Sequence, residues 1–138
     1  MGQNKIKTAD VASGLGLTDP TLTVSTPTTT SVGYLGLPQN TQNANYTTVM
    51  ADSGKHIYHS DASAYTWTID SNVNVAYPIG TTLTFVNDGS GAITIAITSD
   101  TLQFGSSTGS RTLAQYGMAT AVKVTSTKWY INGNAQLT

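Results

Sequence analysis

The sequence contains no cysteine, and only 9% of its 138 residues are charged. The absence of cysteine excludes disulfides and thiolate metal sites, while it leaves the redox compartment open. Because average domains are about one quarter charged, the surface of this protein must consist largely of Thr, Ser, Asn and Gly. These residues suit strands and turns better than helices. Few charges also give weak electrostatic solubility, which favours a protein that is packed in an assembly.

Long apolar segments are missing as well. The N-terminus lacks the apolar run of a signal peptide, and no stretch approaches the roughly 20 apolar residues of a membrane span. The formal net charge of -1 gives no general basic footprint for nucleic acid. We therefore expect no membrane partner, no nucleic-acid partner, and synthesis in the cytosol without an export signal.

Alternation of apolar and polar residues is the strongest pattern that is present. In Thr81–Val86, Leu83 and Phe85 fall on one face, and in Ala92–Ile97 the three isoleucines share a face. The intervening Asn-Asp-Gly-Ser-Gly segment is typical of a tight turn. The stretch from Tyr77 to Ile97 is therefore predicted to be one β-hairpin with its apolar side chains in the core.

Further alternating segments recur about every ten residues, with turn residues between them. Strands are predicted at 46–50, 55–59, 65–69, 101–104, 118–125 and 128–132. No segment carries a sustained helical period. The length suffices for one domain with a modest core. The prediction is an all-β fold, a single antiparallel β-sandwich or barrel over residues 39–138, preceded by an extended N-terminal arm over residues 1–38.

The first 38 residues differ from the rest in having little periodic apolar surface. Glycines would stop a helical turn near Val11, and residues 25–30 form a polar, linker-like tract. Such a segment is either a disordered tail or an extended arm that lies on another surface. We expect an arm that makes attachment and oligomer contacts. Its candidate contact residues are Ile6, Val11, Leu15, Leu17, Leu22, Val24, Tyr34, Leu35 and Leu37.

Two histidines are candidate metal ligands. His56 and His59 are three residues apart on a predicted strand, so their side chains point to opposite faces. A two-histidine metal site needs both on one side. We therefore expect no metal site and no cofactor.

Three other motifs resemble catalytic or ligand sites without their required context. Residues 105–109 match the G-x-S-x-G pattern, but no helix is predicted after the serine, as a nucleophile elbow requires. The Asn87–Gly91 turn lacks the ligand count of a calcium loop. The aspartates at strand ends are explained by turn chemistry, and nothing pairs two of them in a glycosidase cleft. Trp67 and Trp129 lie in phase with apolar neighbours, which favours the core over a sugar platform.

A further set of motifs carries a resemblance to a known class of proteins. The matching segments are Gly33–Asn40, Ala44–Thr47, Asp52–Tyr58, Val75–Thr81, Ala92–Ile95, Gln115–Ala119 and Lys128–Ile131. In this order they resemble a small β domain of tailed-bacteriophage virion proteins, of the head decoration, head-fibre and tail-fibre type. The resemblance covers about Gly33 to Gly133 and consists of turn and strand signatures.

The resemblance implies a non-enzymatic virion protein without catalytic residues. On this basis we expect a capsid decoration or short head-fibre protein, anchored by its arm to the major capsid protein or another virion protein. A homotrimer located in the virion, assembled in the cytoplasm of a bacterial host, is expected. The alternative is a tail-fibre or adhesin module that binds host surface glycans. An enzyme that degrades polysaccharide would need carboxylates converging in a cleft.

Overall fold

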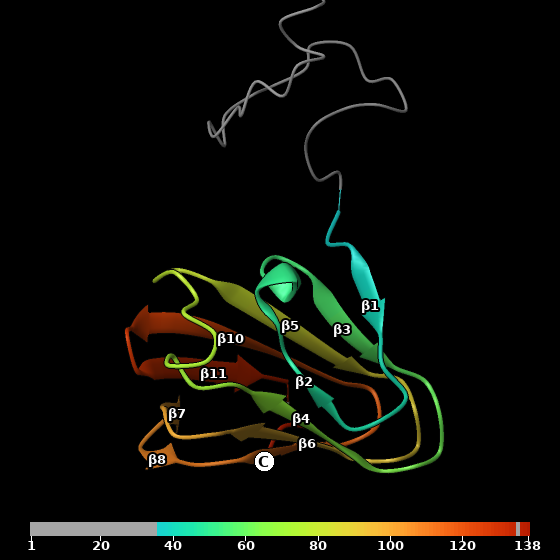
Figure 1. The fold of residues 1–138 in the computed structure, drawn as a ribbon. Helices are drawn as coiled ribbons and strands as arrows, with labels where there is room; N and C mark the ends of the chain where they lie inside the picture. The colour runs from blue at the N-terminus through green and yellow to red at the C-terminus, as the bar shows by residue number, and fades with distance from the viewer. Residues whose placement is uncertain (1–35, 135) are drawn as a thin grey trace, which may run out of the picture. The chain divides into compact units, whose positions relative to one another are not determined.

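The strands of this protein are arranged in two sheets that lie face to face (Figure 1). The computed structural model describes residues 36–134 and 136–138. The elements in this part are β1 (Gln39–Thr41), β2 (Tyr46–Thr47), the 3-10 helix η1 (Met50–Asp52), β3 (His56–His59), β4 (Tyr65–Ile69), β5 (Thr82–Asn87), β6 (Ile93–Ile97), β7 (Thr101–Phe104), β8 (Ser107–Thr108), β9 (Arg111–Leu113), β10 (Gly117–Thr125) and β11 (Lys128–Gly133). The predicted all-β class is confirmed.

Both sheets are mixed, whereas we expected antiparallel pairing. The seven-stranded sheet has the order β1-β3-β5-β10-β11-β7-β8, and the four-stranded sheet has the order β2-β4-β6-β9. Strands β1, β3 and β5 are parallel to one another, and so are β2, β4 and β6. Strand β10 is antiparallel to both of its neighbours, β5 and β11.

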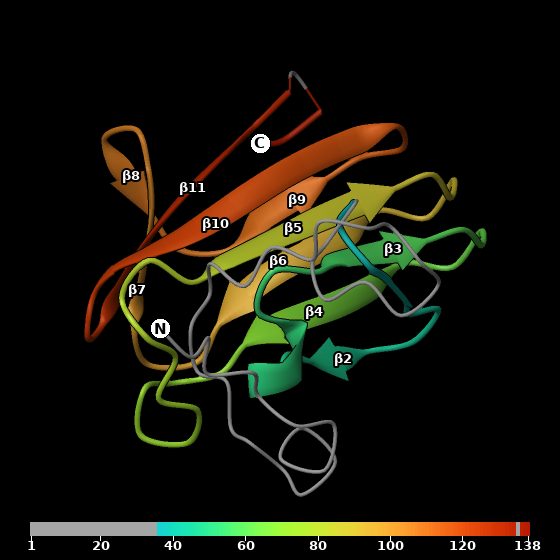
Figure 2. The ribbon, with the colours of Figure 1, turned by 90° about the horizontal axis from the view of Figure 1, so that it is seen from above.

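The parallel pairing arises because the chain changes sheet after each of its first strands. Residues 42–45 link β1 to β2, residues 60–64 link β3 to β4, and residues 88–92 link β5 to β6. We call these links arch 1, arch 2 and arch 3. Because each arch carries the chain across the core in the same sense, the strands of successive arches run parallel. In Figure 2, β3 and β5 lie side by side in one sheet, and β2, β4 and β6 follow one another in the other sheet.

The predicted hairpin over Tyr77–Ile97 is wrong. Strand β5 belongs to the seven-stranded sheet and β6 to the four-stranded sheet, so the two strands do not pair. Leu83 and Phe85 nevertheless face the core, as do Ile93 and Ile95. Alternation specifies which side of each strand is buried, and a hairpin and an arch bury the same side of both strands. The turn predicted to be a hairpin tip is arch 3, in which Gly89 and Gly91 are buried.

The core lies between the two sheets. Trp67 and Trp129 are both fully buried, which confirms their predicted placement. Trp67 of the four-stranded sheet lies 6.1 Å from Phe85 of the other sheet, measured between ring centroids. The remaining buried apolar residues are Ile57, Ile69, Tyr77, Leu83, Ile93, Ile95, Leu102, Leu113, Ala119, Ala121, Ile131 and Leu137.

The described strands form one compact unit. It spans Gly36–Thr138, and its first strand starts at Gln39. Nearly all of the predicted arm lies outside the described residues. Within the described residues, no helix is long and apolar enough to cross a membrane.

Candidate functional site

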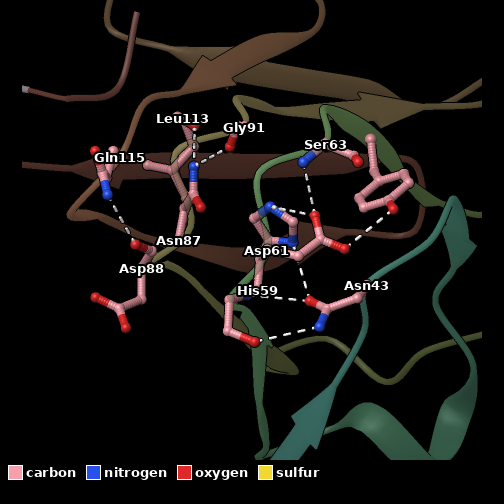
Figure 3. A network of polar contacts seen from close by, with 11 residues as sticks. Asn43, His59, Asp61, Ser63, Asn87, Asp88, Gly91, Leu113 and Gln115 are labelled. Carbon is pink, nitrogen blue, oxygen red and sulfur yellow. Dashed lines mark hydrogen bonds and ion pairs between the residues drawn. The ribbon is translucent and has the colours of Figure 1, made fainter.

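The three arches are joined by a polar network at one end of the sandwich (Figure 3). Asn43 of arch 1 accepts hydrogen bonds through Oδ1 from the Ser60 N–H at 3.0 Å and from the His59 ring at 3.1 Å. The backbone N–H of Asp88 donates to the His59 carbonyl at 2.9 Å. The Asn87 amide donates to the carbonyls of Gly91 and Leu113, both at 2.9 Å. Each arch is thus held by the next.

His59 is the most enclosed titratable group of this network. Its side chain is fully buried, and its ring packs edge-on against Tyr65 and Trp67. Because Asn43 Oδ1 is an acceptor, Nδ1 of His59 carries the donated proton. Nε2 has no hydrogen-bond partner in the described part of the chain and lies 3.7 Å from Oδ1 of Asp61. A group without solvent exposure is not placed to contact a substrate, so we assign His59 a role in joining the arches.

The two histidines lie on opposite faces of β3, as predicted. His56 is on the outer side, where its ring nitrogens lie 3.0 Å from the Leu37 carbonyl and 3.2 Å from Gln39 Oε1. Among residues 36–134 and 136–138, no group of three or more His, Cys, Asp or Glu side chains is arranged to hold a metal ion.

The remaining sequence motifs have structural roles. The G-x-S-x-G segment contains the short strand β8, which pairs antiparallel with β7, and no helix follows it. Asp61 and Asp70 accept backbone N–H groups of Ser63 and Ser71, as turn aspartates do. Asp52 is buried and accepts from Asn40, from the Tyr46 hydroxyl and from a backbone N–H.

Hydrogen bonds and burial shift several pKa values in the folded domain. Hydrogen bonds from the Asn74 side chain and the Ser71 backbone lower the pKa of Asp70. Burial raises the pKa of Tyr77 to about 12, and its hydroxyl donates to Thr48 at 3.0 Å.

The raised pKa of Tyr77 predicts loss of stability in alkali. The unfolded chain releases the Tyr77 proton near pH 10, whereas the folded domain releases it near pH 12. The contribution of Tyr77 to the free energy of unfolding is therefore fully present below about pH 10. It is lost as the pH rises to about 12, by at most about 3 kcal/mol. Denaturation midpoints measured from about pH 9 to about pH 12 should therefore fall less steeply for Tyr77→Phe than for the wild type. Thr48→Val keeps the phenol and should retain the steep decline; parallel curves for wild type and Tyr77→Phe would contradict the prediction.

The outer face of the seven-stranded sheet carries a set of outward-pointing, partly exposed side chains. On β10 and β11 the residues facing the core alternate with outward residues, which include Met118, Thr120, Val122, Tyr130 and Asn132. Met118 is 55% exposed and Tyr130 is 51% exposed. None of the seven strands contains an acidic residue. The face therefore carries few charges and is partly apolar.

A shallow groove of about 460 Å³ lies on this face, over β7, β10 and β11. Tyr130 lies beside Gln103 of β7 and beside Val122 of β10 in the strand register. The groove is lined by Gln103, Gly105, Thr120, Val122, Tyr130, Ile131 and Asn132. It offers an aromatic ring, amides and a hydroxyl without a formal charge, which is chemistry for binding a neutral polar molecule and not for acid–base catalysis.

Of the nine predicted assembly contacts, Leu37 alone lies in the part of the chain that the structure describes. Leu37 is 54% exposed; Ile6, Val11, Leu15, Leu17, Leu22, Val24, Tyr34 and Leu35 lie outside the described residues. The groove residues were not predicted from the sequence, although the alternation in β11 indicates the outward position of Tyr130. Tyr130 is out of phase with the core residues Trp129 and Ile131, which places it on the opposite face.

Comparison of the chain with models of protein families, with characterised proteins and with solved structures gives no match.

Proposed function

We propose that this protein is a non-enzymatic structural component of a phage particle, a capsid decoration or short head-fibre protein. In this proposal residues 1–38 attach the chain to the major capsid protein or another virion protein, and the β domain projects as a homotrimer. The motif resemblance between Gly33 and Gly133 supports the class of protein. The outer face of the seven-stranded sheet is the observation that carries the assembly role.

That face suits contact with other protein surfaces for a physical reason. Burying Met118, Val122 and Tyr130 removes apolar area from water, with a gain of about 25 cal/mol per Å². The absence of acidic residues from these strands means that little charge has to be desolvated. Exposed apolar patches on a folded domain commonly mark interaction sites.

A second candidate function rests on the groove beside Tyr130. Exposed aromatic rings bind the apolar faces of sugars, while amides such as Gln103 and Asn132 hydrogen-bond to hydroxyl groups. A pocket of several hundred Å³ is the usual size for a small ligand. This favours the alternative of an adhesin module that binds uncharged host surface glycans.

One set of variants tests both candidates. Deletion of residues 1–32 should abolish binding to particles that lack this protein, because the attachment segment is gone, while circular dichroism still reports the folded β domain. Co-sedimentation of particles with added protein measures the binding. Tyr130→Ala should leave attachment by the arm intact.

The outcomes separate the candidates. A deleted protein that still sediments with particles would contradict attachment through the arm. If Tyr130→Ala decorates particles normally but abolishes retention of the protein on host cell-wall glycan, the adhesin function is favoured. Wild-type retention by Tyr130→Ala would remove the groove as the glycan site.

A further inference from the structure

Lys123 occupies a core position of the sandwich. It follows Ala119 and Ala121 on the inward side of β10, and only 1% of its surface is exposed. Its Nζ lies 5.8 Å from the centre of the Trp129 ring, and Tyr77 packs edge-on against that ring at 5.4 Å. The amine therefore sits among aromatic side chains.

The surroundings of this amine do not match the needs of an ammonium group. Across residues 36–134 and 136–138, no carboxylate lies within ion-pair distance of Nζ; the one pair found there joins His59 and Asp61. An ammonium carries three donors, yet within the described residues Nζ has a single hydrogen-bond acceptor, Oδ1 of Asn72. A buried charge without a counter-ion is strongly disfavoured relative to the uncharged form.

The contact with Asn72 brings two reactive groups together. Nζ lies 2.5 Å from Oδ1, closer than the usual 2.7–3.2 Å of an N–H···O hydrogen bond. Because a C=O bond is about 1.23 Å long, Nζ lies within about 3.7 Å of the amide carbon of Asn72. That is close to the separation of a near-attack geometry.

The loop between β4 and β5 holds Asn72 in this position. Oδ2 of Asp100 accepts the backbone N–H of Asn72 at 3.0 Å. On the preceding side, Asp70 accepts the Ser71 N–H at 2.7 Å and the Asn74 amide at 3.0 Å. The carboxamide is thus presented to Nζ by a fixed segment, 51 residues away in the sequence.

We propose that Lys123 and Asn72 form an intramolecular isopeptide bond. The lone pair of the uncharged Lys123 amine attacks Cγ of Asn72, and a new bond joins Nζ to Cγ. The bond from Cγ to Nδ2 breaks, and Nδ2 leaves as ammonia after taking one proton from Nζ. The step needs no oxidant and no co-reactant. The product is an uncharged amide, which leaves no ionisable amine at this core position and joins β10 covalently to the loop after β4. Asp100 acts as the positioning residue for Asn72.

Intact mass spectrometry of the purified full chain tests this directly. The wild type should be lighter than its sequence mass by about 17 Da, the mass of ammonia. Trypsin should yield the peptide of residues 56–111 joined to that of residues 112–128, because the linked Lys123 is no longer cleaved. Lys123→Arg and Asn72→Ala should each show their full calculated masses.

Matched controls distinguish this bond from other losses of ammonia. Lys128→Arg and Asn132→Ala replace the same residue types on the neighbouring strand β11 and should keep the deficit. A succinimide at an asparagine would also lose ammonia, but it would persist in Lys123→Arg and leave Lys123 cleavable. Asp100→Ala should increase the unlinked fraction, and Asp100→Asn, which keeps an acceptor, should restore linking. A wild-type protein at its full sequence mass, or a deficit unchanged in Lys123→Arg, would overturn the proposal.

Discussion

Gly91→Ala is expected to unfold the domain or to leave it barely stable. A Cβ at this position would lie 2.0 Å from the Ser63 carbonyl oxygen and 2.2 Å from the Ser63 carbonyl carbon. These atoms belong to the backbone of arch 2, so relief requires the two arches to separate. Overpacking typically costs about 1–3 kcal/mol. The separation also strains the buried hydrogen bond from Asn87 to the Gly91 carbonyl, which adds about 1–3 kcal/mol.

The expected total of about 2–6 kcal/mol is comparable with the whole stability of a domain, about 5–15 kcal/mol. Urea denaturation followed by tryptophan fluorescence measures it. Gly36→Ala is the matched control, because a Cβ there meets no atom within 4 Å, and its effect should stay within about 0.5 kcal/mol. A Gly91→Ala protein with wild-type stability would mean that arches 2 and 3 do not approach this closely.

The arch that contains Gly91 could not be predicted from the sequence. The segment Asn87–Gly91 has the composition of a hairpin turn, and composition alone does not distinguish a hairpin from an arch. In a hairpin the apolar faces of the two strands lie side by side, whereas in an arch they oppose each other across the core. Period-2 alternation is identical in both cases. The burial of Leu83, Phe85, Ile93 and Ile95 was therefore predictable, while their assignment to two sheets was not.

Parallel pairing was missed for a related reason. Short connections usually join antiparallel strands, and parallel neighbours usually need a long crossover. Here β3 is parallel to β5 because β4 and the following loop intervene in the other sheet. The choice of a parallel neighbour over an antiparallel one is specified by tertiary contacts, such as the contact between Asn43 and His59. These contacts join residues of different arches and strands.

The candidate sites also include some features that the sequence predicts and others that it does not. The opposite orientation of His56 and His59 follows from strand geometry and was predicted correctly. The burial of Lys123 beside two alanines was visible in the alternation of β10, but its partner Asn72 lies in a loop without any pattern. The groove beside Tyr130 combines three strands, β7, β10 and β11, and the sequence does not indicate that β7 lies next to β11.

Trp67→Ala is the second change with a large expected effect. The side chain is fully buried, lies at the centre of β4, and contacts Phe85 across the core and His59 at the base of arch 2. Truncation of a buried tryptophan to alanine typically costs about 3–5 kcal/mol. Because both sheets and the arch network meet at this ring, we expect a large drop in the urea midpoint, together with increased hydrogen exchange at the arches.

Thr66→Ala provides the control on the same strand. Thr66 is exposed, and its backbone N–H donates to Asn45. Its side-chain hydroxyl makes no hydrogen bond within the described part of the chain. Its replacement should therefore change stability by no more than about 0.5 kcal/mol. If Trp67→Ala and Thr66→Ala were equally mild, the two faces of β4 would be energetically equivalent, and Trp67 would not join the sheets. If Trp67→Ala lowered stability without increasing exchange at residues 60–64, the core and the arch network would be separate sources of stability.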